Sequence, residues 1–305
     1  MPIRIAIIGY GKIARDQHIP SIEANPDYAL TALVTPSGDP GIGLPWFASH
    51  SELYTAMAGE VDAIAICTPP PIRFVIARDA LLAGLDVLLE KPPTATLGEL
   101  EQLEGLARAH QRTLYTAWHS QHAAAVPRAR ALLAGADISG LQIRWFEDVR
   151  KWHPGQEWIW APGGFGVLDP GINALSIATR ILPMPLLVRE ARLLVPANRQ
   201  APIAASLSFG DGLSAEMDWR YTQGEEWTIE IERADGCKLE LRDGGARLLI
   251  DGIEQAIEAR GEYPSIYADF AALIAARAIE VDREPLRIAA DAFLVGHRQP
   301  VEAFV

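Results

Sequence analysis

The chain has 305 residues, a length that suits two domains better than one, because single hydrophobic cores stop growing near this size. Hydrophobic residues make up 49% and charged residues 22%, an ordinary soluble composition that excludes disorder as the default state. The formal net charge of -12, without a Lys- or Arg-rich block, argues against binding to nucleic acid or to an anionic membrane surface.

The cysteines and the N-terminus set the expected compartment. Cys67 and Cys237 do not make a disulfide framework or a zinc ribbon, so we expect two buried thiols in a reducing environment. The apolar start Ile3–Ile8 is short and ends in a glycine turn, which indicates a strand and not a signal peptide. No run approaches the length needed to span a bilayer. These features predict a cytoplasmic protein.

Short apolar runs alternate with helical patterns in the first third of the chain. The predicted strands are Ile3–Ile8, Leu30–Val34, Val61–Ile66, Asp86–Leu89 and Thr113–Thr116. Such runs are typical of a parallel sheet covered on both faces. Ser49 with Glu52, and Thr96 with Glu99, have the capping-box spacing of helix starts. This βαβ alternation predicts a doubly wound α/β domain.

The pattern changes near residue 120. The expected elements are a helix Ala124–Leu133, a strand Leu141–Val149, a helix from Pro170, then the strands Leu187–Val195, Ile203–Phe209, Leu213–Tyr221, Trp227–Arg233, Lys238–Arg242 and Leu248–Ile250, and the helices Ser265–Ile279 and Leu286–Gly296. Consecutive strands on short turns predict an antiparallel sheet. We therefore expect an α/β protein with an N-terminal Rossmann domain, residues 1–120, with a doubly wound parallel sheet. A second α/β domain with an open, mainly antiparallel sheet should follow, residues 121–305.

A G-x-G-x-x-A turn follows the first strand, from Gly9 to Ala14. The first glycine permits the tight turn, Gly11 lets a pyrophosphate approach the backbone, and Ala14 lets the helix pack close to the strand. The alternative is an ordinary strand–turn–helix without a ligand. The position within a βαβ unit favours a dinucleotide site, with Gly9, Gly11, Lys12 and Ile13 as candidate contacts.

The end of the second strand bears on cofactor choice. An NAD-selective fold places Asp or Glu on the ribose hydroxyls about 20 residues past the glycines. Here the strand ends in Thr35 and Ser37, which can donate hydrogen bonds to a 2′-phosphate and do not repel it. Asp39 lies slightly further on and is a possible ribose partner. The sequence predicts that NADP is accepted, alongside NAD.

Glu90-Lys91-Pro92-Pro93 follows the fourth strand. Ligands of doubly wound sheets lie at the carboxyl ends of strands, and the prolines fix the backbone just after the lysine. A lysine there can contact both nicotinamide and substrate oxygens. The alternative is an exposed Glu–Lys pair on a loop.

Several stretches together resemble a known enzyme family. The glycine turn, Cys67–Pro70 and Glu90–Pro92 resemble the glucose–fructose oxidoreductase/inositol dehydrogenase/MocA family. Longer stretches resemble the branch of that family that contains bacterial D-galactose and L-arabinose 1-dehydrogenases: Gly11–His18, Ala117–Ser120, Glu147–Gln156 and Asp169–Ile177. The resemblance implies a Rossmann domain followed by a domain with an open, mainly antiparallel sheet. It also implies cofactor contacts from Cys67, Thr68, Pro69, Glu90, Lys91 and His119.

Asp169 and Asn173 mark a departure from the wider family, whose motif ends in Asp and His four residues apart. Asn cannot ionise, so the base role falls on Asp169, on Lys91, or on a water that they hold. We favour Asp169 as the base, with Asn173 binding a sugar hydroxyl. The alternative for Asp169 is a plain helix N-cap before Pro170.

The segment Glu147–Trp160 combines polar groups with three tryptophans. Such a mixture suits a sugar, whose C–H faces pack on aromatic rings while its hydroxyls take hydrogen bonds. Candidate substrate contacts are Lys91, His119, Glu147, His153, Asp169 and Asn173. His18 and Trp158 are candidates of second rank. A structural alternative is that the tryptophans pack in the core and the carboxylates pair with arginines such as Arg150.

These residues predict an NAD(P)-dependent aldose 1-dehydrogenase that oxidises the anomeric carbon of a galactose- or arabinose-type sugar to its lactone. Lys91, Asp169 and Asn173 would form the catalytic set, and no metal is needed for hydride transfer. An inositol or other polyol dehydrogenase would need a base at residue 173. A non-catalytic sugar or cofactor sensor should lack Lys91 or Asp169, and both are present. The sequence leaves the preferred sugar and the oligomeric state open.

Overall fold

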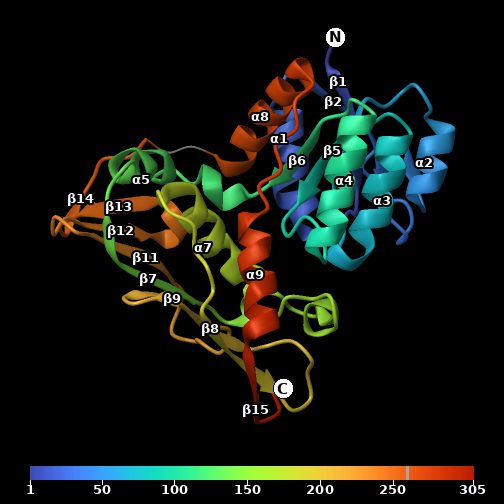
Figure 1. Cartoon of the computed structure of the whole chain (residues 1–305). Helices are drawn as coiled ribbons and strands as arrows, with labels where there is room; N and C mark the ends of the chain where they lie inside the picture. The colour runs from blue at the N-terminus through green and yellow to red at the C-terminus, as the bar shows by residue number, and fades with distance from the viewer. Residues whose placement is uncertain (259–260) are drawn as a thin grey trace. The chain divides into compact units, whose positions relative to one another are not determined.

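The computed structural model describes residues 1–258 and 261–305, which form two compact units (Figure 1). The first unit consists of Met1–Trp118 and Tyr263–Arg283, and the second of His119–Glu262 and Glu284–Val305. The expected division near residue 120 assigned Tyr263–Arg283 to the C-terminal domain. That segment instead packs with the first unit, because its apolar face, which includes Phe270, joins the buried cluster around Ile5.

The first unit is built on a six-stranded parallel sheet with the order β3-β2-β1-β4-β5-β6. Its strands are β1 (Ile3–Ile8), β2 (Tyr28–Val34), β3 (Trp46–Phe47), β4 (Ala63–Ile66), β5 (Asp86–Glu90) and β6 (Leu114–Ala117). The strand order reverses between β1 and β4, which is where doubly wound sheets bind ligands. The predicted Rossmann sheet is confirmed, and only the two-residue β3 was not anticipated.

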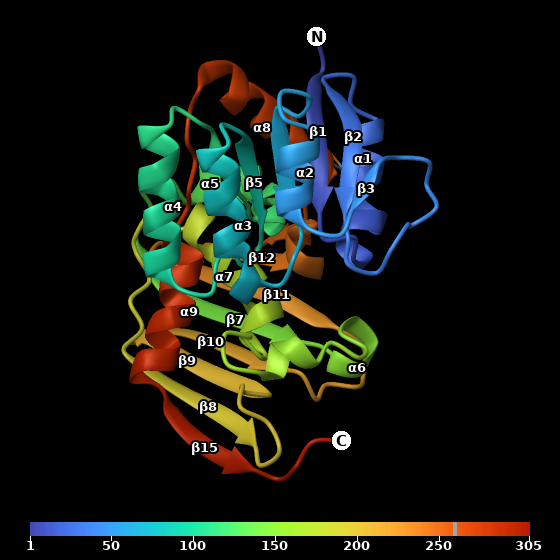
Figure 2. The same ribbon diagram turned by 90° about the vertical axis from the view of Figure 1, so that its right-hand side faces the viewer.

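Helices cover both faces of this sheet. They are the π-helical turn η1 (Ala14–His18), α1 (Ile19–Glu23), α2 (His50–Ala56), α3 (Pro70–Leu82), α4 (Leu97–Ala109) and α8 (Glu262–Ala276). Figure 2 shows α2, α3 and α4 on one face, whereas α1 and α8 share the cluster on the other. The predicted capping box of Thr96 and Glu99 is present, but Ser49 and Glu52 form only half of one, since Glu52 Oε2 accepts from Ala48 N.

The second unit contains a nine-stranded sheet with the order β14-β13-β12-β11-β7-β10-β9-β8-β15. Its strands are β7 (Ile138–Phe146), β8 (Glu190–Pro196), β9 (Ala204–Gly210), β10 (Leu213–Asp218), β11 (Glu226–Arg233), β12 (Lys238–Arg242), β13 (Arg247–Ile250), β14 (Ile253–Glu254) and β15 (His297–Val301). All neighbours are antiparallel except β7 with β10 and β8 with β15. The expected open, mainly antiparallel sheet is therefore confirmed.

One face of this sheet is covered by helices (Figure 1). The helical elements of the unit are η2 (His119–His122), α5 (Val126–Leu133), α6 (Val149–Trp152), η3 (Glu157–Trp160), α7 (Leu168–Ile181), η4 (Asp243–Gly245) and α9 (Glu284–Val295). The predicted strand through Val149 was too long, because β7 ends at Phe146 and Val149 begins α6. Within residues 1–258 and 261–305, no helix has both the length and the apolar character required of a membrane span.

Candidate active site

The glycine turn of the first unit lies where β1 ends. Gly9 has φ +99°, and a Cβ there would lie 2.9 Å from the carbonyl carbon of Cys67, so only glycine fits between the ends of β1 and β4. A Cβ on Gly11 would meet nothing within 4 Å, which leaves its backbone open to an approaching ligand. Lys12 is exposed and pairs with Asp16, and Ile13 is half-buried. The turn has the form that brings backbone N–H groups to a pyrophosphate.

The hydroxyl of Thr68 indicates whether a cofactor fits this edge of the sheet. It follows β4 next to the glycine turn, and its hydroxyl is buried without a hydrogen-bond partner among the described residues. A buried hydroxyl without a partner costs free energy, which a polar ligand at this edge would relieve. Cys67 and Pro69 flank it, both at the carboxyl end of β4. The residues present therefore fit a dinucleotide.

The structure places Thr35 and Ser37 at the end of β2. Thr35 is buried, and its hydroxyl accepts the N–H of Ser37 at 3.3 Å, while Ser37 itself is exposed. Asp39 is occupied in its own turn, because its Oδ1 accepts the N–H of Gly41 at 2.8 Å. The hydroxyl of Thr35 accepts in this bond and can still donate its own proton, and the hydroxyl of Ser37 is exposed. Both can therefore hydrogen-bond to a substituent on a ribose.

The backbone around Lys91 is held from two directions in the first unit. The Glu90 carboxylate, 3% exposed, accepts the N–H of Lys91 at 2.7 Å and the hydroxyl of Tyr263 at 2.6 Å. The buried Arg73 guanidinium donates to the carbonyl oxygens of Thr68, Glu90 and Pro92. Glu90 and Lys91 are thus not an exposed loop pair, and the position of Lys91 at the end of β5 is closely defined.

In the second unit, Asp169 lies in the first turn of α7 and is 3% exposed. The alternative of a plain N-cap is not found, because the helix begins at Leu168 and no side chain caps it. Asn173 lies one turn further along and is half-buried. Gly171 lets this turn press against β10, since a Cβ there would lie 2.2 Å from Sδ of Met217. The helix start is thereby fixed against the sheet.

Glu147 and His153 accompany Asp169 in the same unit. His153 Nε2 lies 3.9 Å from Oε1 of Glu147 and 4.0 Å from Oδ2 of Asp169, so the imidazole lies between two buried carboxylates. Nδ1 of His153 lies 3.3 Å from Oε1 of Gln156. These side chains lie on either side of α6 and at the start of α7, and they form one polar cluster.

Tryptophan side chains surround this cluster. Glu147 accepts the indole N–H of Trp219 at 3.2 Å and that of Trp227 at 3.0 Å. Trp219 also packs against His153, with ring centroids 5.3 Å apart, and against Trp160 at 5.1 Å. Carboxylates and an imidazole among indole rings are a suitable environment for a sugar. The structural alternative, a carboxylate of this segment paired with an arginine, is found at Asp148, whose Oδ1 lies 3.0 Å from Nε of Arg150.

Three further predicted residues lie elsewhere. His119, at the start of η2, contacts Glu262 through Nδ1 at 2.7 Å and is partly exposed. His18 is fully buried in the first unit, so it is not available to a substrate. Trp158 lies in η3 and is half-buried.

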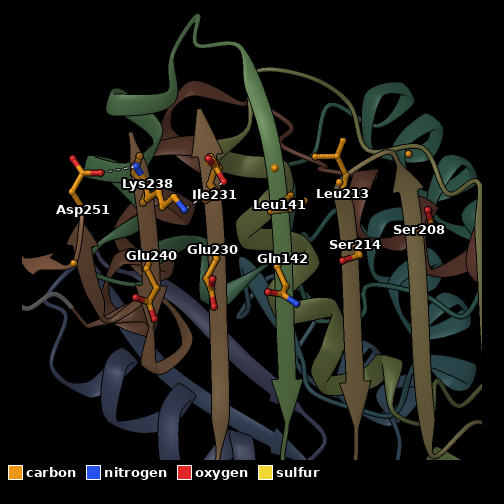
Figure 3. A pocket seen from close by; sticks show the side chains of 16 residues that line it. Leu141, Gln142, Ser208, Leu213, Ser214, Glu230, Ile231, Lys238, Glu240 and Asp251 are labelled. Carbon is orange, nitrogen blue, oxygen red and sulfur yellow. Dashed lines mark hydrogen bonds and ion pairs between the residues drawn. The ribbon is translucent and has the colours of Figure 1, made fainter. Parts of the chain in front are cut away.

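A hollow of about 640 Å³ on the sheet of the second unit contains none of the predicted residues. Gln142, Ser214, Glu230 and Glu240 project into it from four strands (Figure 3). Its lining is polar and lies away from the Glu147 cluster along β7. We therefore do not place the active site there.

Sequence reasoning missed the partners that hold these groups. Arg73, Trp219, Trp227, Glu262 and Tyr263 belong to no local motif, and each becomes relevant only through a contact distant in sequence. Tryptophans at the ends of predicted strands were the one available signal. No group of three or more His, Cys, Asp or Glu side chains suited to a metal occurs among the described residues.

Comparison with known proteins agrees with this geometry. The family described as "Oxidoreductase family, NAD-binding Rossmann fold" (GFO_IDH_MocA) matches residues 3–118. Galactose 1-dehydrogenase of Pseudomonas fluorescens is 48% identical over 307 aligned residues, which cover 99% of both chains. The chain belongs to this oxidoreductase family.

Solved structures extend the likeness of this oxidoreductase to the whole fold. A crystal structure of D-galactose-1-dehydrogenase from Rhizobium etli matches with a TM-score of 0.92 and 47% identity, over 100% of this chain and 98% of the other. The 3-ketoreductase KijD10 of Actinomadura kijaniata, in complex with TDP-benzene and NADP, has a TM-score of 0.82 at 18% identity, covering 99% and 100% of the two chains. The second match concerns the fold alone.

Proposed function

We propose that this oxidoreductase is an NAD(P)-dependent aldose 1-dehydrogenase, which oxidises the anomeric carbon of a galactose- or arabinose-type sugar to the lactone. The observation that carries the proposal is the 48% identity to galactose 1-dehydrogenase over 99% of both chains. The polar cluster among indole rings in the second unit supports a sugar as substrate.

Asp169 is the proposed base. It takes the proton of the C1 hydroxyl while C1 loses its hydrogen with the bonding electron pair, and the C1–O bond becomes a carbonyl. When bound, the nicotinamide cofactor supplies the acceptor for that electron pair and hydrogen. Lys91, an ammonium donor, orients the C1 oxygen and stabilises the negative charge that develops on it. The alternative base is Lys91 itself, or a water that Lys91 and Asp169 hold.

The other polar side chains would bind the sugar and the cofactor. Asn173, Glu147, His153 and His119 are proposed to hydrogen-bond sugar hydroxyls, which can both donate and accept. The residues proposed to hold the cofactor are Gly9, Gly11, Lys12, Ile13, Thr35, Ser37, Cys67, Thr68, Pro69, Glu90, Lys91 and His119.

A substrate panel tests the activity. NAD(P)H absorbance should grow with D-galactose and L-arabinose, since arabinose is galactose without its exocyclic CH₂OH group. A steric difference of this size discriminates by only about 1–3 kcal/mol, so the two rates should overlap. Growth with inositol but with no aldose would overturn the proposal in favour of a polyol dehydrogenase.

Binding titrations test the cofactor preference. Because no carboxylate stands at residues 35 or 37, we expect NADP to bind within about a hundredfold of NAD. Ser37→Asp should weaken NADP selectively, since a carboxylate would repel the 2′-phosphate, while Ser37→Ala serves as the uncharged control. Loss of NAD binding together with NADP in Ser37→Asp would contradict this placement.

A further inference from the structure

His18 is a buried histidine with two side-chain partners. It ends the π-helical turn η1, where π-helical geometry often marks a functional position, and it is 0% exposed. Its Nε2 lies 3.0 Å from Oε1 of Glu90, and its Nδ1 lies 2.7 Å from the hydroxyl of Tyr267. Both ring nitrogens are therefore engaged, which fixes the plane of the imidazole.

The Glu90 carboxylate connects this imidazole to Lys91. Oε1 faces His18 and also accepts the Tyr263 hydroxyl, whereas Oε2 accepts the backbone N–H of Lys91 at 2.7 Å. A rotation of this carboxylate would move both oxygens together. A group that holds Oε1 therefore also holds the hydrogen bond at the Lys91 backbone.

The charge state of His18 strengthens this contact. Burial lowers the pKa of His18, but the neighbouring Cys67 thiol and the Glu90 carboxylate raise it to about 10. The titratable groups that face the imidazole are Cys67, Glu90, Tyr263 and Tyr267. The imidazolium donates from both nitrogens, so its bond to Glu90 is charge-assisted and of the stronger kind.

We propose that His18 is a positioning residue, which holds Lys91 in its working place through the Glu90 carboxylate. The proposal rests on the role given to Lys91 in the proposed function. It predicts that the donor at Nε2 matters, and not merely the volume of the side chain. A histidine that only fills the core would show no such distinction.

Two variants separate the two ring nitrogens. In His18→Gln the side-chain amide reaches the place of Nε2 and keeps a donor toward Glu90, without the charge. In His18→Asn the shorter amide lies at the place of Nδ1 and keeps only the partner Tyr267. Both variants bury an amide in the same site, so urea unfolding should show similar losses of stability in the two.

Hydrogen exchange at Lys91 is the first readout and needs no catalysis. Pro92 and Pro93 have no N–H, so Lys91 provides the only backbone amide proton of the segment Lys91–Pro93. We expect its exchange to be about tenfold faster or more in His18→Asn, since that variant leaves Glu90 without a donor at the place of Nε2, and nearly unchanged in His18→Gln, which keeps one. Equal exchange in both variants, or exchange that follows only global unfolding, would overturn the proposal.

Steady-state kinetics provide the second readout. His18→Asn should lower kcat about tenfold with little change in the KM for the cofactor, and His18→Gln should restore most of kcat. In a Lys91→Met background the same substitution should cost nothing more, because the two residues act as one unit. Additive losses would show that His18 acts independently of Lys91 and would refute the inference.

The two proposals can fail separately. If the wild-type protein oxidises no sugar, but Lys91 exchange still distinguishes His18→Asn from His18→Gln, the proposed function falls and the positioning by His18 stands. If the protein is an active sugar dehydrogenase and the two variants behave alike at Lys91, the positioning falls and the function stands.

Discussion

Asp169 combines burial with a position at a helix start. The first turn of α7 provides the positive end of the helix dipole, which favours a negative charge there. His153 of the same unit lies beside it, with Nε2 4.0 Å from Oδ2 of Asp169. Asp169 is therefore a buried carboxylate beside an imidazole, and its proposed role as the base starts from this arrangement.

Asp169→Asn tests the base. The amide keeps the shape and cannot take the proton, so kcat should fall by about 10²–10⁴-fold, the usual contribution of a general base. Cofactor binding should change much less, because Asp169 is not among the residues proposed to hold the cofactor. Stopped-flow turnover and cofactor fluorescence titration measure the two effects. A variant that retains most of its turnover would move the base role to Lys91 or to a water.

Lys91→Met tests the ammonium group. It keeps the length of the side chain but removes both a donor and a charge, so kcat/KM for the sugar should fall further than in Asp169→Asn. Lys91→Arg is the matched control that retains the charge with a different shape. If Lys91→Met left kcat/KM intact, Lys91 would have no role at the C1 oxygen.

At the level of elements, α7 depends on one glycine for its contact with the sheet. Gly171→Ala would place a Cβ 2.2 Å from Sδ of the buried Met217, so it should lower the free energy of unfolding by about 1–3 kcal/mol. Gly105→Ala in α4 is the control, because a Cβ there meets nothing within 4 Å and should stabilise by about 0.5–1 kcal/mol. Urea unfolding measures both. Equal effects would mean that α7 is not closely packed at Gly171.

The elements that the sequence predicted well are those with local signals. β1 and the capping box at Thr96 follow from a β-branched run and from a fixed residue spacing. The start of α7 was placed two residues late, because Asp-Pro imitates a cap, whereas the packing of Leu168 extends the helix. β15 was missed because His297–Val301 carries no apolar alternation and becomes a strand only by pairing with β8.

At the scale of the whole molecule, the buried His18 makes stability depend on pH. Its pKa is about 10 in the folded protein and 6.5 for the free side chain, so the folded state binds the proton more tightly. The contribution of His18 to the free energy of unfolding should be fully present below pH 6.5 and should be lost as pH rises toward 10, by an amount on the order of a few kcal/mol. Urea midpoints across this range measure the fall.

The controls for this pH dependence address the neighbouring groups. His18→Gln should remove most of the fall, because the amide does not titrate. Cys67→Ser should separate the contribution of the thiol that faces the imidazole. A wild-type stability that stays flat between pH 6.5 and 10 would show that His18 is not held as an imidazolium.

The candidate site was accessible from sequence only in part. Lys91 and Asp169 stand out because each follows a recognisable local pattern of strand end or helix start. Arg73 and Tyr263 do not, because their relevance arises from long-range contacts to Glu90 and its neighbours that no spacing encodes. His18 is a third such residue, because only the folded chain brings it to Glu90 and buries it away from a sugar.

The order of the chain has a consequence for synthesis on the ribosome. The first stretch of the first unit ends at Trp118, and only Tyr263–Arg283 completes the unit. That later segment supplies Tyr267 to His18 and Tyr263 to Glu90. A nascent chain that has emerged as far as residue 120 still lacks those partners and the apolar face of α8. Residues 1–118 therefore stay incompletely buried until nearly the whole protein has been translated. A fragment that ends near residue 120 is expected to expose this surface to chaperones and proteases.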